Sequence, residues 1–94
     1  MRPNQREAPA PYERDHRRVA IAFAGVLKLA RNGAGISQEE LAEAADIDRT
    51  YPSLLERGLR QPTLAVLIAV ASAPNMEPAL LVTMTVARLR GEAR

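Results

Sequence analysis

Side chains that could recognise a ligand gather in one part of the chain, between Gln38 and Arg60. This segment brings arginine, threonine and serine close together, and arginine suits both phosphate oxygens and the acceptor edge of guanine. Every basic residue of the chain except Lys28 is an arginine, although a GC-rich coding sequence would produce the same excess. The net charge of +2 and the pI near 9.7 are compatible with nucleic acid but too modest to indicate it alone.

The residue types that usually carry catalysis are scarce. His16 is the only histidine and lies in a charged stretch, where a solvated surface role is a better interpretation than a general base or ligand. Asp46 and Asp48 suggest a paired-carboxylate site, but turn and cap chemistry accounts for both. The sequence has no phosphate-binding glycine loop, zinc-ligand spacing or nucleophile motif. We therefore expect a protein that is not an enzyme and has no catalytic residues, cofactor or metal.

Length and composition favour one small all-α domain. The 94 residues allow a single hydrophobic core, and 47% of them are apolar while only 3% are aromatic. Such a core is built from closely packed Ala, Leu, Val and Ile, which suits helices better than sheets. Cysteine is absent, so no disulfide framework is possible, and no stretch approaches the roughly 18 apolar residues of a membrane span. We expect a soluble cytoplasmic protein, associated with the nucleoid when bound to DNA.

Apolar periodicity and helix-capping residues predict five helices. Residues 1–13 contain three prolines and are expected to form a flexible arm, and residues 14–94 to form the domain. Ser37 and Glu40 have the spacing of a capping box, while Gly58 suits the end of a helix. The expected helices are 14–32, 37–45, 48–57 with Asp48 as its cap, 64–73 and 78–90. Only Asp46 and Ile47 separate the second helix from the third, so residues 37–57 are predicted to form a helix-turn-helix.

The stretch from Ile36 to Ala73 resembles the Cro/C1-type (lambda-repressor-like, XRE) helix-turn-helix family. The matching residues are Gln38, Leu41, Ala42, Ile47, Ser53, Leu55, Glu56, Arg57, Gly58, Pro62, Leu64, Leu67 and Ile68. The resemblance implies a five-helix fold and a sequence-specific double-stranded DNA-binding transcriptional regulator, such as a repressor. It also implies that the third helix enters the major groove, and a homodimer of such a chain would read a palindromic operator.

By the resemblance, four residues face base edges and four contact phosphate. The base-contacting residues are Arg49, Thr50, Ser53 and Leu54. The phosphate candidates are Gln38, Tyr51, Arg57 and Arg60. We expect Arg49, in the first turn of the third helix, to be the principal reader of a guanine; a phosphate contact is its alternative role.

Two residues depart from the family pattern. Asp46 stands where glycine is usual, which is tolerable because aspartate visits the left-handed region more readily than most residues. Pro52 stands where an aliphatic residue is usual, and counted from Asp48 it is the fourth helical residue. It would then forfeit the first backbone bond of the third helix, so that helix either starts late or bends.

The resemblance also implies an ion pair between Arg31 and Glu56, whose alternative is two independent solvated charges. Separately, Val82, Val86 and Leu89 form an apolar stripe on the last helix, while Leu81 and Met84 face the core. The stripe predicts a homodimer interface. The alternative is that the first helix folds back and covers it with Val19 and Phe23.

The strongest rival function is that of a protein-binding module on the same fold, such as an antiactivator or antitoxin-like partner. Its support is the acidic character of residues 38–57, which contain six carboxylates and two arginines. An arginine-rich RNA binder is a weaker rival, because the arginines are scattered and no aromatic stacking set is present.

Overall fold

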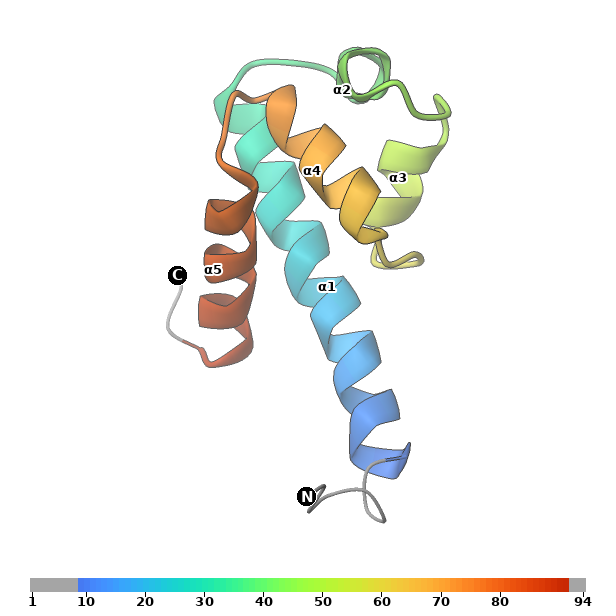
Figure 1. Cartoon of the computed structure of the whole chain (residues 1–94), viewed down its shortest axis with the longest axis vertical. Coiled ribbons are helices and arrows are strands. Elements are labelled where there is room, and N and C mark those ends of the chain that lie inside the picture. The colour runs from blue at the N-terminus through green and yellow to red at the C-terminus, as the bar shows by residue number, and fades with distance from the viewer. Residues whose placement is uncertain (1–8, 92–94) are drawn as a thin grey trace.

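A computed structural model describes residues 9–91, with side chains from His16 onward, and this part of the chain folds into five α-helices without a strand (Figure 1). The helices are α1 (Pro9–Gly33), α2 (Gln38–Ala45), α3 (Tyr51–Glu56), α4 (Leu64–Ser72) and α5 (Pro78–Leu89). The all-α class and the five-helix architecture predicted from the sequence are confirmed.

The long helix α1 is the element against which α3 and α5 both pack. Helix α5 packs on one side of it and α3 on another, while α2 and α4 pack on each other and α4 also meets α5 (Figure 1). Each helix contributes at least one fully buried side chain to the shared core. These include Leu27, Leu41, Leu55, Val70 and Leu81, all at 0% exposure. Burying one such side chain stabilises the fold by roughly 1.5–3 kcal/mol, so these aliphatic residues supply most of the core.

Helix α1 begins at Pro9, earlier than the predicted start at Arg14. Residues 9–13, expected to belong to a flexible arm, are therefore helical, and residues 1–8 of that arm lie outside the described residues. The prolines misled the prediction because first-turn amides have no acceptor within a helix, so a proline there forfeits no hydrogen bond.

The start and end of α2 follow the sequence prediction. Ser37 Oγ accepts the Glu40 amide at 3.0 Å, and Glu40 Oε1 accepts the Ser37 amide at 2.8 Å, which completes the capping box. Asp46 closes the helix at φ 58° and ψ 47°, the left-handed conformation that glycine usually supplies.

Helix α3 starts later than predicted. Its first residue is Tyr51, so Pro52 is the second helical residue and its missing amide hydrogen costs no helical bond. Asp48 is consequently not the cap of α3, and Thr50 occupies that position. Of the two consequences expected of Pro52, the late start is the one that the structure adopts. The Pro52 ring is fully buried in the fold.

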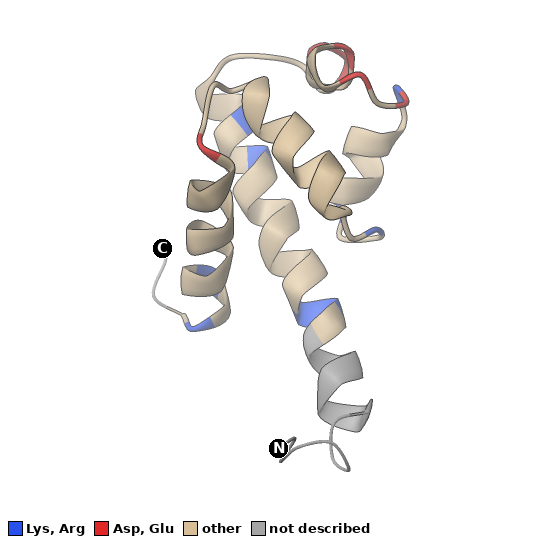
Figure 2. Ribbon diagram, viewed as in Figure 1, with Lys and Arg blue, Asp and Glu red and all other residues tan. Residues whose placement is uncertain are grey.

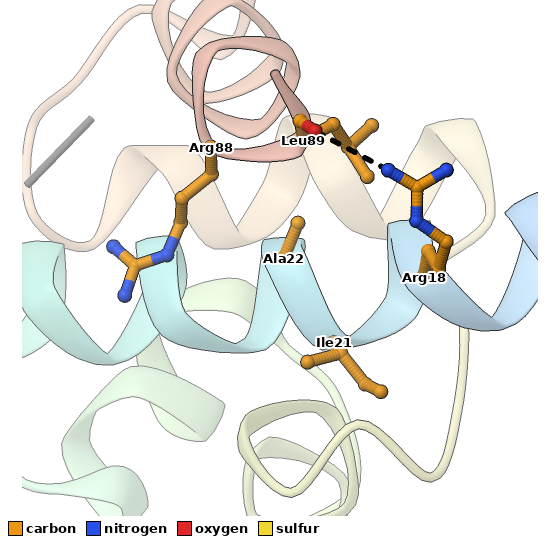
Figure 3. Close-up of a pocket in the computed structure, with 5 residues that line it drawn as sticks. All are labelled: Arg18, Ile21, Ala22, Arg88 and Leu89. Atoms are coloured by element: carbon orange, nitrogen blue, oxygen red, sulfur yellow. Dashed lines mark hydrogen bonds between the residues drawn. The ribbon is translucent and has the colours of Figure 1, made fainter. Parts of the chain in front are cut away.

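Helices α4 and α5 begin where the sequence predicted, at Leu64 and Pro78. Figure 3 shows two arginines at the junction of α5 with α1. Arg18 Nη2 donates a hydrogen bond to the Leu89 carbonyl at 3.3 Å, and the Arg88 guanidinium lies against α1. Gly25 allows that approach, because a Cβ there would lie 2.8 Å from Arg88 Nη2.

No single helix within residues 9–91 is long and apolar enough to cross a membrane. Residues His16–Gly33 and Gln38–Ala45 reach that length and composition only as a pair, across a 98° bend.

Gly58 ends α3 in a Schellman motif. The Gly58 amide donates to the Leu55 carbonyl at 3.1 Å, and the Leu59 amide donates to the Leu54 carbonyl at 3.0 Å. The motif requires the left-handed conformation, and Gly58 has a φ of +72°. A Cβ at this position would also lie 3.3 Å from Ile21 Cγ1 of α1.

Gly58→Ala is therefore expected to lower the free energy of unfolding by about 1–2 kcal/mol, the cost of a left-handed non-glycine residue. Gly33→Ala is the matched control, since Gly33 is helical and nothing lies within 4 Å of the added Cβ. The control should leave stability unchanged or raise it slightly. Chemical denaturation measures both, and equal losses in the two variants would contradict this description of the α3 end.

Candidate nucleic-acid interface

A buried glutamate joins the three helices that form the candidate interface. Glu56 at the end of α3 has a side chain only 3% exposed. Arg31 Nε lies 2.6 Å from Glu56 Oε2 and Arg31 Nη2 lies 3.0 Å from Oε1, so the two residues named for an ion pair form a bidentate one. Gln38 Nε2 donates to the same Oε1 at 3.0 Å. Arg31 Nη1 also donates to the Ile36 carbonyl at 2.8 Å.

This network fixes the end of α1, the start of α2 and the end of α3 relative to one another. The hydrogen bond that Arg31 donates to Glu56, opposed by burial and assisted by the Glu56 charge, raises the pKa of Arg31 above its usual range. A bidentate pair with such low exposure is stronger than an ordinary surface ion pair, and loss of one partner leaves the other buried without compensation.

A recess of about 530 Å³ lies between the start of α2 and the outer face of α3. Its lining residues are Gln38, Glu39, Arg49, Thr50, Ser53, Leu54 and Arg57. It therefore brings together all four predicted base-contacting residues and two of the four phosphate candidates. We refer to it as the reading recess.

Two phosphate candidates lie elsewhere. The Tyr51 side chain is partly buried and packs against the hydrophobic core. Arg60 lies in the loop after α3 and lines a separate recess beside α1. The sequence pattern places both residues near the third helix, but it does not reveal which way their side chains turn.

Arg49 and Thr50 lie in the turn before α3, and the prediction that Arg49 occupies the first helical turn is wrong. The Asp48 carboxylate ties this turn by accepting the Thr50 hydroxyl and, at 3.0 Å, the Thr50 amide. These two hydrogen bonds, with a smaller effect of the Arg49 charge, lower the pKa of Asp48. The carboxylate therefore holds the turn at neutral pH and releases it only when the pH falls through that lowered pKa.

The acidic residues of this region have two different roles. Three accept hydrogen bonds within the chain: Glu40, Asp48 and Glu56. Glu39, Glu43 and Asp46 are exposed on α2 and the following turn, where Figure 2 shows the ribbon in the colour of acidic residues. Glu39 lines the reading recess and was not among the predicted site residues, although the acidity of the segment was a signal for it.

A second recess, the apolar groove, has a volume of about 360 Å³ and lies between α1, the start of α4, and α5. The predicted stripe forms its α5 side: Val82, Val86 and Leu89. Val19 and Phe23 line the same groove from α1, and the stripe is covered only in part, since Val82 is 46% exposed while Val86 and Leu89 are half-buried. Leu81 is fully buried and Met84 packs against the core, as the sequence predicted.

Among the described residues, no group of three or more His, Asp or Glu side chains is placed to hold a metal ion.

Comparison with known proteins gives a family consistent with this geometry. A helix-turn-helix family model matches residues 27–81, more than half of the chain, so the chain belongs to the helix-turn-helix family, of the Cro/C1 type that the sequence resembles. It is 43% identical over 53 residues to the control protein C.SmaI of Serratia marcescens. That match covers 56% of this chain and 63% of the length of C.SmaI.

Two solved structures are also similar. The restriction-modification controller protein C.AhdI from Aeromonas hydrophila has a TM-score of 0.64 and 35% identity, covering 66% of this chain and 94% of C.AhdI. The controller protein C.Esp1396I, solved as a tetramer with its natural 35-base-pair operator, has a TM-score of 0.69 and 26% identity. That match covers 77% of this chain and 95% of C.Esp1396I.

The Glu56 network predicts that Glu56→Gln destabilises the fold by about 1–3 kcal/mol, since the Arg31 guanidinium loses a charged partner at a site with little solvent. Glu43→Gln makes the same chemical change at an exposed position of α2 and should shift stability by less than about 0.5 kcal/mol. Thermal unfolding of both variants measures the difference, and indistinguishable melting temperatures would contradict a structural role for the network.

Proposed function

We propose that this chain is a sequence-specific double-stranded DNA-binding transcriptional regulator, acting as a homodimer on a palindromic operator with α3 in the major groove. The observation that carries the proposal is the reading recess, which places Arg49, Thr50, Ser53, Leu54 and Arg57 together beside the start of α2. The likeness to restriction-modification controller proteins supports it, because C.Esp1396I is described on its operator.

The recess residues suit a short helix end entering a groove. Ser53 lies on α3, Arg49 lies in the turn before it and Arg57 follows its last residue, and all three line the same recess. Helix α3 has six residues and is about 9 Å long at a rise of about 1.5 Å per residue. A major groove about 12 Å wide admits a helix with its side chains. In this arrangement Arg49, in the turn that the Asp48–Thr50 hydrogen bonds hold, would reach deepest into the major groove.

In addition to the contacts of α3 in the groove, the start of α2 contacts the DNA backbone. First-turn amides have no acceptor within a helix and suit a phosphate. The Gln38 side chain is held by Glu56, so the network positions the residue that the resemblance assigns to a phosphate. The Glu56 carboxylate thereby fixes the distance between the base-contacting residues of the reading recess and the phosphate contact of Gln38.

The apolar groove supports the homodimer. Between Gln61 and Ala87 the sequence has one charged residue, Glu77. Leu64 on the rim of the groove is 72% exposed, and Val82 is 46% exposed. A surface with so little charge is compatible with a second copy of itself, because a symmetric contact opposes each residue with the partner's equivalent surface. In such a dimer the two α3 helices should lie about 34 Å apart.

The protein-binding alternative rests on a specific observation as well, the acidic wall that Glu39 gives to the reading recess. A carboxylate there opposes the DNA backbone and would suit a basic protein surface. The two functions differ in whether the recess distinguishes one duplex sequence from another.

Arg49→Ala tests the proposed reader on DNA selected from the region upstream of the protein's own gene. Loss of a bidentate guanine contact should cost about 1–3 kcal/mol, concentrated at one base pair when single-base variants of the site are compared. Arg60→Ala, at a phosphate candidate outside the recess, should weaken all sites alike. Fluorescence anisotropy measures both. A uniform loss for Arg49→Ala would assign it to phosphate, and a wild-type chain without sequence preference would favour the protein-binding function.

The dimer is tested by a charge placed in the groove. Val82→Glu should raise the dimer dissociation constant by at least about tenfold, because the carboxylate would be buried without a partner. Leu80→Glu is a close control, since Leu80 lies on the same helix, is also 46% exposed and does not line the groove. Light scattering at micromolar concentration gives the masses. A wild-type monomer, alone and on DNA, would contradict the dimer.

A further inference from the structure

A third recess, of about 290 Å³, lies where α1 passes the loop between α3 and α4. Arg17 lines it from α1 and Arg60 from the loop. Two contacts attach residues 58–61 of the loop to α1. Gly58 packs against Ile21, and the Gln61 side-chain amide donates a hydrogen bond to the His16 carbonyl. The two arginines therefore lie on one surface, although they are far apart in the sequence.

The charge of this recess differs from that of the reading recess. Among the side chains from His16 onward that the structure describes, no acidic residue lines it, whereas Glu39 lines the reading recess. The two recesses are also continuous along the chain, since Arg57 lines the first and the next residue, Gly58, lines the second. Three arginines thus lead from the outer face of α3, through the following loop, to α1.

Binding of DNA by the helix-turn-helix segment requires basic residues from outside that segment. Contacts to phosphates supply much of the affinity for a duplex, and they depend on basic side chains. Residues 38–57 carry six carboxylates and two arginines, so this segment alone contributes little electrostatic attraction. Helix α1 extends past the α3–α4 loop to Pro9 (Figure 1), so Arg17 lies within the helix, as predicted, and not at its end.

We propose that Arg17 and Arg60 form a phosphate-binding recess that holds the DNA backbone beyond the reading recess. The proposal rests on the proposed function and adds α1 to the DNA footprint. Arg17 would position the protein without reading sequence, since a phosphate contact is the same for every base pair. Its ligand is the sugar-phosphate backbone of the duplex whose bases occupy the reading recess.

The test is the salt dependence of binding to the selected duplex and to a scrambled one. Each phosphate contact contributes about 0.9 to the slope of log K against log salt concentration. Arg17→Ala should lower the magnitude of that slope by about one and weaken binding to both duplexes by the same factor, roughly threefold to tenfold. Arg17→Lys keeps the charge and should restore most of the slope. Arg90→Ala removes an exposed arginine from the end of α5, outside this recess, and should leave the slope unchanged.

A slope unchanged by Arg17→Ala, with Arg60→Ala lowering it, would overturn the proposal and leave the proposed function standing. Equal effects of Arg17→Ala and Arg90→Ala would also overturn it, because they would report overall charge rather than a site. A loss for Arg17→Ala confined to one base pair would make Arg17 a base reader instead. Failure of the wild-type chain to prefer the selected duplex would remove the proposed function itself, a result visible before any variant is compared.

Discussion

The buried carboxylate of Glu56 is the constraint on which the rest of the interface depends. It accepts hydrogen bonds from Arg31 of α1 and Gln38 of α2 while its own backbone ends α3. A core of small aliphatic side chains fills the space between helices but does little to fix their relative orientation, since the hydrophobic effect is not directional. The side chains of Arg31, Gln38 and Glu56 fix that orientation through their hydrogen bonds. They set how α3 stands beside the start of α2, and hence the shape of the reading recess.

Pro52 is the second constraint on the interface, and it shortens α3. With Tyr51 as its first residue, the helix has six residues, and the proposed reader Arg49 lies in the preceding turn. A turn residue would ordinarily be less well ordered than a helical one. The Asp48 carboxylate compensates by holding Thr50 through both its amide and its hydroxyl, so an acidic residue close to the proposed DNA surface has a structural reason to be there.

The sequence predicted the parts of this structure that depend on local chemistry. The capping box of Ser37 and Glu40, the start of α4 and the start of α5 follow from residue types a few positions apart. The Arg31–Glu56 pair joins residues 25 positions apart and was reached only through the family resemblance. Most of the reading recess was reached in the same way.

What the sequence did not predict depends on position within an element or on the direction of a side chain. Proline reads as a helix breaker unless the helix start is already known, which misplaced the beginning of α1. The beginning of α3 was misplaced by taking Asp48 as its cap, although Pro52 had indicated a late start as one of two outcomes. Tyr51 and Arg60 were assigned by their place in the chain, but one packs on the core and the other faces α1. The sequence identified Glu39 only as part of an acidic segment and did not predict that it lines the reading recess.

Contact between DNA and the recess of α2 and α3 can be mapped residue by residue. The most direct measurement is the map of amide chemical-shift changes when the isotope-labelled chain is titrated with its selected duplex. We expect the largest changes at Gln38 and across residues 49–57, with smaller ones around Arg60 and Arg17. Changes confined to α4 and α5, or none at duplex concentrations where binding is saturated, would contradict this contact.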